Sequence, residues 1–137
     1  AEGNNRLYLT EAEENTLRKA LDEQCDTHEI KGLKLKLIQT VFRQTIGYNK
    51  REDDLTGTCL QKLVGSRRDY CNKHVTEMIN QSILLFRRGY YGRILSINYN
   101  FDDWGKAPED VETQRSEPEK YLQNNMQKDQ ESSQRCT

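Results

Sequence analysis

Between residues 55 and 99, the alternation of apolar and polar positions predicts two helices and then a hairpin. Apolar side chains recur every three or four residues up to Gly65, and again from Ser66 to about Gln81, as on one face of a helix. Thr56 and Ser66 are predicted to cap these helices, because a hydroxyl accepts a hydrogen bond from the first free N–H groups. Gly65 is a favourable residue at which to end the first helix.

The hairpin is predicted from two apolar runs, residues 82–88 and 93–99, which surround a loop bracketed by Gly89 and Gly92. Helix, turn, helix and hairpin is the element order of a winged helix. The predicted fold class is therefore α+β and mostly α. We expect a winged helix-turn-helix with a two-stranded wing and an extra N-terminal helix.

The extra helix is predicted over residues 10–24, where Thr10 and Glu13 form a capping box. Its apolar stripe is thin, so it either packs on the core or pairs with a second copy of the chain. A helix with a broad apolar face follows over residues 31–45 and breaks at Gly47. Tyr48 and, much later, Trp104 are interpreted as core residues, since a lone aromatic residue more often packs than binds.

The two ends of the chain differ from this middle part. The sequence has 137 residues and a mean hydropathy of -1.02, which favours one domain with polar arms. Residues 10–106 are predicted to form the domain and residues 1–9 a flexible N-terminus. Residues 107–137 are expected to be an acidic, polar, disordered tail because they contain few apolar side chains. No run resembles a signal peptide or a membrane span, so we expect a cytoplasmic protein that does not contact a membrane.

Charge is segregated along the chain, although the net charge is only -1. Residues 1–30 contain three basic and eight acidic residues, and residues 107–137 contain four and seven. Residues 31–106 contain fourteen basic and seven acidic residues. A basic module between acidic arms suits a polyanionic ligand.

Other chemistry is less well supported. Cys25-x-x-His28 and Cys71-x-x-His74 could supply a zinc set, but the spacing between the pairs matches no zinc finger. We therefore expect no metal and no cofactor. The acidic pairs Asp53-Asp54 and Asp102-Asp103 lack a spaced lysine or histidine that would complete a nuclease site. No catalytic residues are assigned, and the protein is not expected to be an enzyme.

A family resemblance adds to this interpretation. The segment Phe42-Arg43-Gln44-Thr45-Ile46-Gly47-Tyr48-Asn49-Lys50, followed by Asp53-Asp54-Leu55-Thr56 and closing at Asn98 and Trp104, resembles the phage replication protein O family. The resemblance covers roughly residues 17–104. It implies an origin-binding replication initiator that docks on repeated sites as a dimer. It also implies a separate C-terminal region that recruits the replicative helicase through a loader, which we expect to lie outside this chain. A phage-encoded protein would act in the cytoplasm of the bacterial host.

The second helix of a winged helix enters the major groove of double-stranded DNA, which exposes a distinct pattern of donors and acceptors for each base pair. Arg68 and Asn72 are the predicted base readers. The candidate contacts on this helix are Arg67, Arg68, Asn72, Lys73 and Thr76. Those of the wing are Arg87, Arg88, Tyr90, Tyr91 and Arg93. Phosphate contacts are predicted for Lys50, Arg51, Thr56 and Thr58.

Three functions are considered. The first is sequence-specific binding of double-stranded DNA as a phage or mobile-element replication initiator, or as its DNA-binding domain. The second is a winged-helix transcriptional regulator. The third is an adaptor whose winged helix binds a protein partner. A homodimer is expected to form through the N-terminal helix or the edge of the hairpin.

Overall fold

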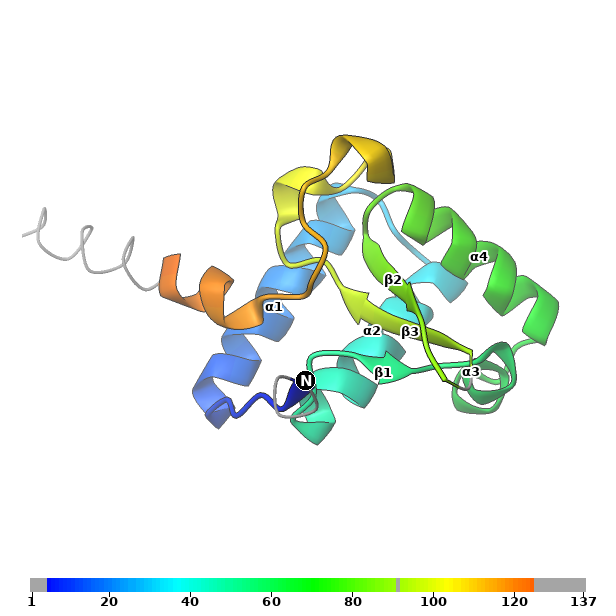
Figure 1. The fold of residues 1–137 in the computed structure, drawn as a ribbon, viewed down its shortest axis with the longest axis horizontal. Coiled ribbons are helices and arrows are strands. Elements are labelled where there is room, and N and C mark those ends of the chain that lie inside the picture. Colours follow the sequence, from blue (N-terminus) through cyan, green and yellow to red (C-terminus); the bar gives the residue numbers. More distant parts are fainter. Residues whose placement is uncertain (1–4, 91, 125–137) are drawn as a thin grey trace, which may run out of the picture.

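The computed structural model describes residues 5–90 and 92–124, which form a mostly helical α+β fold, as predicted (Figure 1). The α-helices are α1 (Glu11–Thr27), α2 (Leu33–Thr45), α3 (Gly57–Val64) and α4 (Arg68–Asn80). The strands are β1 (Asp53–Asp54), β2 (Leu84–Arg88) and β3 (Arg93–Ile97). The short 3-10 helices are η2 (Ile46–Tyr48), η3 (Phe101–Asp103) and η4 (Pro108–Asp110), and residues 118–124 are also helical.

The three strands form one antiparallel sheet in the order β1-β3-β2. Pairing of β2 with β3 confirms the predicted hairpin, with Leu84 opposite Ile97 and Arg88 opposite Arg93. The third strand was not predicted. Asp53–Asp54 is two acidic residues long and has no apolar alternation, so only its pairing with Leu95 and Ile94 in β3 reveals it.

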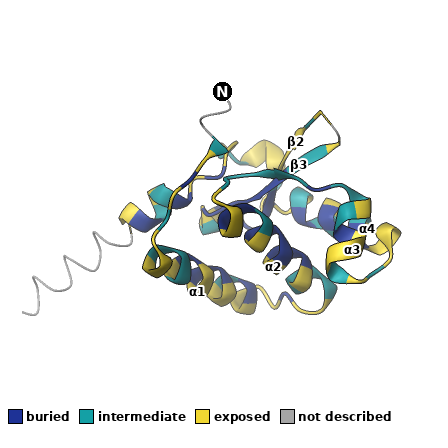
Figure 2. Ribbon diagram, turned by 90° about the horizontal axis from the view of Figure 1, so that it is seen from below, coloured by how far each residue is buried: buried dark blue, intermediate teal, exposed yellow. Residues whose placement is uncertain are grey.

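The core lies between the sheet and the helices, with α2 at its centre (Figure 2). Leu37, Ile38 and Val41 of α2 are fully buried, as are Met78 of α4 and Leu95 of β3. In α1, α2 and α4 the apolar face that periodicity predicts is the face that packs, whereas in α3 Leu60 is buried and Leu63 of the same predicted stripe is 44% exposed. Burial of such side chains stabilises a fold by roughly 1.5–3 kcal/mol each. The thin stripe of α1 also faces this core, so α1 needs no second copy to bury it.

The helix caps agree with the sequence analysis at all but one position. Thr10 forms the predicted capping box with Glu13, and Thr56 accepts a hydrogen bond from the backbone N–H of Cys59. Gly65 ends α3 in a left-handed conformation, with φ 73°. The prediction that Ser66 caps α4 is wrong. The N-cap is Arg67, which has an extended backbone and makes no side-chain capping bond, so the helix begins one residue later than predicted.

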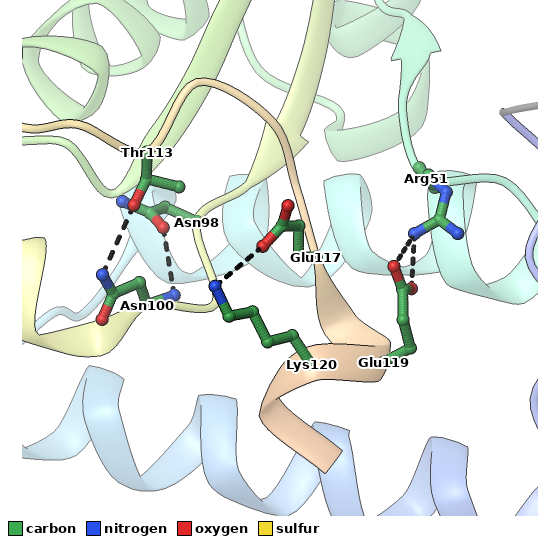
Figure 3. A network of polar contacts seen from close by, with 7 residues as sticks. All are labelled: Arg51, Asn98, Asn100, Thr113, Glu117, Glu119 and Lys120. Carbon is green, nitrogen blue, oxygen red and sulfur yellow. Dashed lines mark hydrogen bonds and ion pairs between the residues drawn. The ribbon is translucent and has the colours of Figure 1, made fainter. Parts of the chain in front are cut away.

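The C-terminal segment packs on the domain over residues 107–124, in contrast to the disordered tail that we expected. Leu122 is buried, and the Tyr121 ring lies edge-on to Phe101, with centroids 5.3 Å apart. Arg51 forms an ion pair with Glu119 (Figure 3). The prediction failed because it rested on the polar composition of residues 107–137 as a whole, whereas a few apolar residues are enough to anchor part of the segment. The rest of the predicted tail, residues 125–137, lies outside the described residues.

The segment before α1 also packs, although we expected residues 1–9 to be flexible. Arg6 forms a β-bridge with Lys50, and the Leu7 N–H donates to the Asn49 carbonyl at 2.9 Å. The Leu7 side chain is buried. A single apolar side chain and a few backbone hydrogen bonds therefore hold a short segment whose composition gives no periodic signal. Residues 1–4 lie outside the described part of the chain.

The two aromatic residues that were assigned to the core behave differently. Trp104 is buried, and its indole N–H donates to the Asn98 carbonyl at 2.8 Å, which confirms the prediction. Tyr48 is 62% exposed, so the same prediction is wrong for this residue. Tyr48 ends η2, and the following Asn49 adopts a left-handed conformation that turns the chain. Among the described residues, no helix is long and apolar enough to span a membrane.

Candidate nucleic-acid interface

The start of α3 lies directly against the start of α4, and Gly57 permits this approach. A Cβ atom at Gly57 would lie 2.7 Å from Asn72 Oδ1 and 2.8 Å from Arg68 Cγ. Both distances are shorter than contacts that real Cβ atoms make, so a larger residue would force the two helices or these side chains apart. Gly57 therefore sets the positions of Arg68 and Asn72. No role for Gly57 was predicted from the sequence.

A groove of about 460 Å³ opens where the starts of α3, α4 and β3 meet. Hereafter "the groove" is the site lined by Thr56, Gly57, Thr58, Arg68, Asp69, Asn72, Gly92 and Arg93. It brings together five of the predicted contact residues: Thr56, Thr58, Arg68, Asn72 and Arg93. These residues come from three elements, so only the packing of the fold makes them neighbours.

Arg93 joins the hairpin to α4 at the floor of the groove. Its Nη2 donates to Asn72 Oδ1 at 2.7 Å, and its Nε donates to the Leu55 carbonyl at 3.2 Å. Burial lowers the pKa of the Arg93 guanidinium from its ordinary value. An arginine still keeps its charge at neutral pH. Arg93 therefore contributes positive charge to the groove and also orients Asn72, whose carbonyl end it occupies.

The outward face of α4 presents cations at the N-terminal end of the helix. Arg67 and Arg68 are exposed there, and Lys73 and Thr76 are exposed further along. The Arg67 guanidinium lies 5.4 Å from the centroid of the Tyr70 ring, which is half exposed. Positive charge at a helix N-terminus opposes the helix dipole, at a cost of roughly 0.3–1 kcal/mol per charge. A bound anion would offset that cost.

The hairpin projects from the body of the molecule and its tip is exposed (Figure 2). The Arg87 Nε donates to Glu52 Oε1 at 2.9 Å, and this hydrogen bond raises the pKa of Arg87. Arg88 is exposed and forms no ion pair within the described residues. Tyr90 is 92% exposed, whereas Tyr91 lies outside the described residues. Glu52 is an unpredicted partner of the wing, and nothing in its local sequence indicates that role.

Three of the predicted phosphate contacts have other partners. Lys50 lies 3.5 Å from Asp53, and Arg51 pairs with Glu119. Both precede β1, whose other end leads to the groove, so the structure does not bring them to the groove. The Thr56 hydroxyl caps α3 and is used by the fold itself. Thr58 is exposed and lines the groove.

The cysteine and histidine residues do not assemble into a metal centre within the part of the chain that the structure describes. Cys25 and Cys71 are buried in the core. The His28 ring packs on Trp104 with centroids 5.5 Å apart. His74 lies on α4, and its Nδ1 is 3.6 Å from a carboxylate oxygen of Glu77.

The same part of the chain that carries these elements matches a known family. The model of the bacteriophage replication protein O family matches residues 15–104, about two thirds of the sequence. The chain belongs to this family. Comparison with curated proteins and with solved structures gives no match.

Membership of the replication protein O family implies a role in phage DNA replication. The segment that carried the resemblance, residues 42–50, forms the end of α2 and all of η2. Thr45 and Asn49 serve the fold here. The Thr45 hydroxyl donates to the Val41 carbonyl at 2.7 Å, and Asn49 supplies the left-handed turn. Arg43 and Tyr48 of the same segment are exposed.

Proposed function

We propose that this protein binds double-stranded DNA sequence-specifically through a winged helix-turn-helix, as an origin-binding initiator of phage replication. The observation that carries the proposal is the exposed, cationic N-terminal end of α4 beside the groove. The element order α2-β1-α3-α4-β2-β3 supports the winged-helix interpretation. Membership of the replication protein O family supports the biological setting.

In this proposal α4 enters the major groove, which is about 12 Å wide and admits a helix. Arg68 would contact guanine with two parallel hydrogen bonds, and Asn72 would contact adenine by donating from Nδ2 to N7 and by accepting from the N6 amino group with the lone pair of Oδ1 that Arg93 does not use. Arg67, Lys73 and Thr76 would contact phosphates or bases next to them. Such contacts contribute roughly 1–3 kcal/mol each when they read a base.

The hairpin would lie along the neighbouring backbone, with Arg88 and Tyr90 at its exposed end. Arg87 would contribute after exchanging Glu52 for a phosphate, since the ion pair is solvent-exposed and costs little to open. Thr58 would donate to a phosphate from the first turn of α3. Lys50 and Arg51 are left out of this interface because they lie before β1.

We further propose that the DNA-binding unit consists of residues 10–106 together with the flanking segments that pack on them, and that it acts as a homodimer on repeated sites in the bacterial host cytoplasm. A helicase loader would be recruited by a region beyond this unit. Neither part of the proposal assigns catalysis to the chain. The unit positions DNA, and the later steps of initiation would belong to its partners.

The experiment that tests the function is selection of bound duplexes from a random pool, followed by a salt titration on the selected sequence. We expect enrichment of one motif, arranged as repeats or as an inverted pair. Because Lys and Arg contacts release counterions from DNA, the logarithm of the binding constant should fall linearly with the logarithm of salt concentration. Footprints on repeated sites in a phage origin would place the protein in initiation.

Other outcomes distinguish the alternatives. Footprints confined to promoters, with altered transcription, would support a regulator. Absence of duplex binding at low salt, together with capture of a defined protein partner, would support an adaptor. A salt slope near zero would contradict phosphate-driven binding.

A further inference from the structure

The family segment at residues 42–50 contains exposed side chains that the proposed duplex interface does not use. Thr45 and Asn49 are explained by folding. Tyr48 is 62% exposed, and Arg43 is exposed and forms no ion pair within the described residues. A single exposed aromatic ring is ordinary, but exposed apolar side chains that gather in one place mark an interaction site.

The chain before α1 brings a second exposed tyrosine to the same place. The Arg6–Lys50 bridge is antiparallel, and the Leu7 N–H donates to the Asn49 carbonyl at 2.9 Å. This hydrogen bond places Leu7, the neighbour of Tyr8, against Asn49, the neighbour of Tyr48. Since side chains alternate along an extended chain, Arg6 and Tyr8 face away from the core while Leu7 is buried.

The tyrosine patch is defined here as the side chains that the two bridged segments and the end of α2 carry at this place: Arg6, Tyr8, Arg43, Tyr48 and Lys50. Tyr8 is 71% exposed. Its hydroxyl accepts a hydrogen bond from Arg6 Nη1 at 3.0 Å, which holds a cation at the hydroxyl end of the side chain. Arg43 lies beside Gly47, where a Cβ atom would be 3.7 Å from Arg43 Cγ. Lys50 lies 3.5 Å from Asp53, the one carboxylate that pairs with a cation of the patch within the described residues.

The rings of the patch are available for stacking. Within the described residues, the aromatic pairs involve His28, Tyr99, Phe101, Trp104 and Tyr121, and neither Tyr8 nor Tyr48 takes part in one. Two unstacked rings beside three cations match what proteins use to hold single strands: stacking platforms for bases and positive charge for the backbone.

From this arrangement we propose that the tyrosine patch binds single-stranded DNA, with bases stacked on Tyr8 and Tyr48 and phosphates beside Arg6 and Arg43. A duplex is a poorer ligand for this surface, because its bases already stack on one another and present no free face to a ring. A protein of phage DNA replication acts where strands separate, so single-stranded DNA is present where it acts. The patch residues precede β1 in the chain, and none of them lines the groove, which begins after β1 at Thr56.

The test uses the full chain and a fluorescent oligo(dT) strand, which forms no duplex, with fluorescence anisotropy as the readout. We expect the Tyr8→Ala, Tyr48→Ala double variant to bind oligo(dT) about tenfold more weakly or worse, because stacking on both rings is lost. Tyr48→Phe should bind like the unchanged protein, since stacking needs the ring and not the hydroxyl. Tyr48→Phe is therefore also the matched control, because it changes the same residue and keeps the exposed ring.

A second arm separates stacking from charge. An abasic strand of the same length keeps the phosphates but has no bases, so the unchanged protein should bind it more weakly than oligo(dT). The double variant should bind both strands alike. Thermal melting of each variant controls for folding, and the comparison of abasic and oligo(dT) strands on the unchanged protein keeps the test decisive if the double variant melts early.

Three results would overturn the proposal. One is unchanged oligo(dT) binding by the double variant, and another is equal binding of abasic and oligo(dT) strands by the unchanged protein. The third is a loss of duplex affinity as large as the loss of oligo(dT) affinity, which would make the patch a flank of the duplex footprint. If selection enriches no duplex, the function proposed for α4 is contradicted. The single-strand proposal is tested separately, by oligo(dT) binding of the tyrosine variants.

Discussion

The groove and the tyrosine patch share no residue and use the same residue types in different ways. In the groove, Arg93 is partly buried and donates hydrogen bonds to Asn72 and to the Leu55 carbonyl. In the patch, Arg6 and Arg43 are exposed, and the aromatic rings beside them are unstacked within the described residues. The groove is thus preorganised for a ligand of defined shape, whereas the patch offers adaptable contacts. Preorganised donors suit base readout, and adaptable rings with cations suit a ligand read without sequence.

The largest expected effect is at α4. Replacing both Arg67 and Arg68 by alanine should weaken binding to the selected duplex by about 30-fold or more, since each base or phosphate contact contributes roughly 1–3 kcal/mol. The melting temperature should hardly change because both side chains are exposed. Oligo(dT) binding should fall much less. Intact duplex affinity, measured by anisotropy at fixed salt, would refute the assignment of α4 as the reading helix.

Arg93→Met should have the next largest effect. It removes hydrogen bonds to Asn72 and Leu55 at a partly buried site, which should lower the free energy of unfolding by about 1–3 kcal/mol. Duplex affinity should also fall, since Asn72 loses the group that orients it. Arg43→Met is the matched control in the tyrosine patch and should leave stability unchanged. Urea denaturation of both variants measures the difference, and equal stabilities would contradict the structural role of Arg93.

Two glycine-to-alanine variants test how much the close packing around the backbone matters at Gly57 in the groove and at Gly47 beside the patch. Gly57→Ala should weaken duplex binding severalfold, because its Cβ would meet Asn72 and Arg68 at less than 3.0 Å. Gly47→Ala places its Cβ at an ordinary 3.7 Å from Arg43 and should leave duplex binding unchanged. Anisotropy with the selected duplex provides the comparison. Equal affinities for the two variants would show that the close approach at Gly57 does not position the contact residues.

Arg51→Ala should have the smallest effect on DNA binding, below about twofold for the duplex. Arg51 pairs with Glu119 on the C-terminal segment, so its loss should instead loosen residues 118–124. The change in stability should be below about 1 kcal/mol, the usual limit for pairs that keep solvent contact. Hydrogen exchange over that segment is the measurement, with Glu119→Gln as the partner variant. A strong loss of duplex affinity would instead indicate that Arg51 contacts the duplex.

Much of the fold could be predicted because its signals are local. Thr10 and Thr56 cap helices through hydrogen bonds that span three residues, and the glycines around the hairpin loop shape a turn that pairs near neighbours. The candidate contacts at Arg67, Arg68 and Lys73 were also predictable. Their place on the exposed face of α4 follows from the helical period.

Other features depended on which distant segments meet, and the sequence carried no local sign of them. Strand β1 exists because Asp53 and Asp54 lie beside β3, and Arg51 pairs with a residue 68 positions away. Tyr48 is an aromatic residue, of a type that usually packs in a core, yet it lies in solvent beside the turn at Asn49. The sequence by itself determined periodicity, capping and charge, because these act over a few residues. Only the tertiary structure decided partners and exposure, because hydrogen bonding and burial depend on groups that the chain brings together from afar.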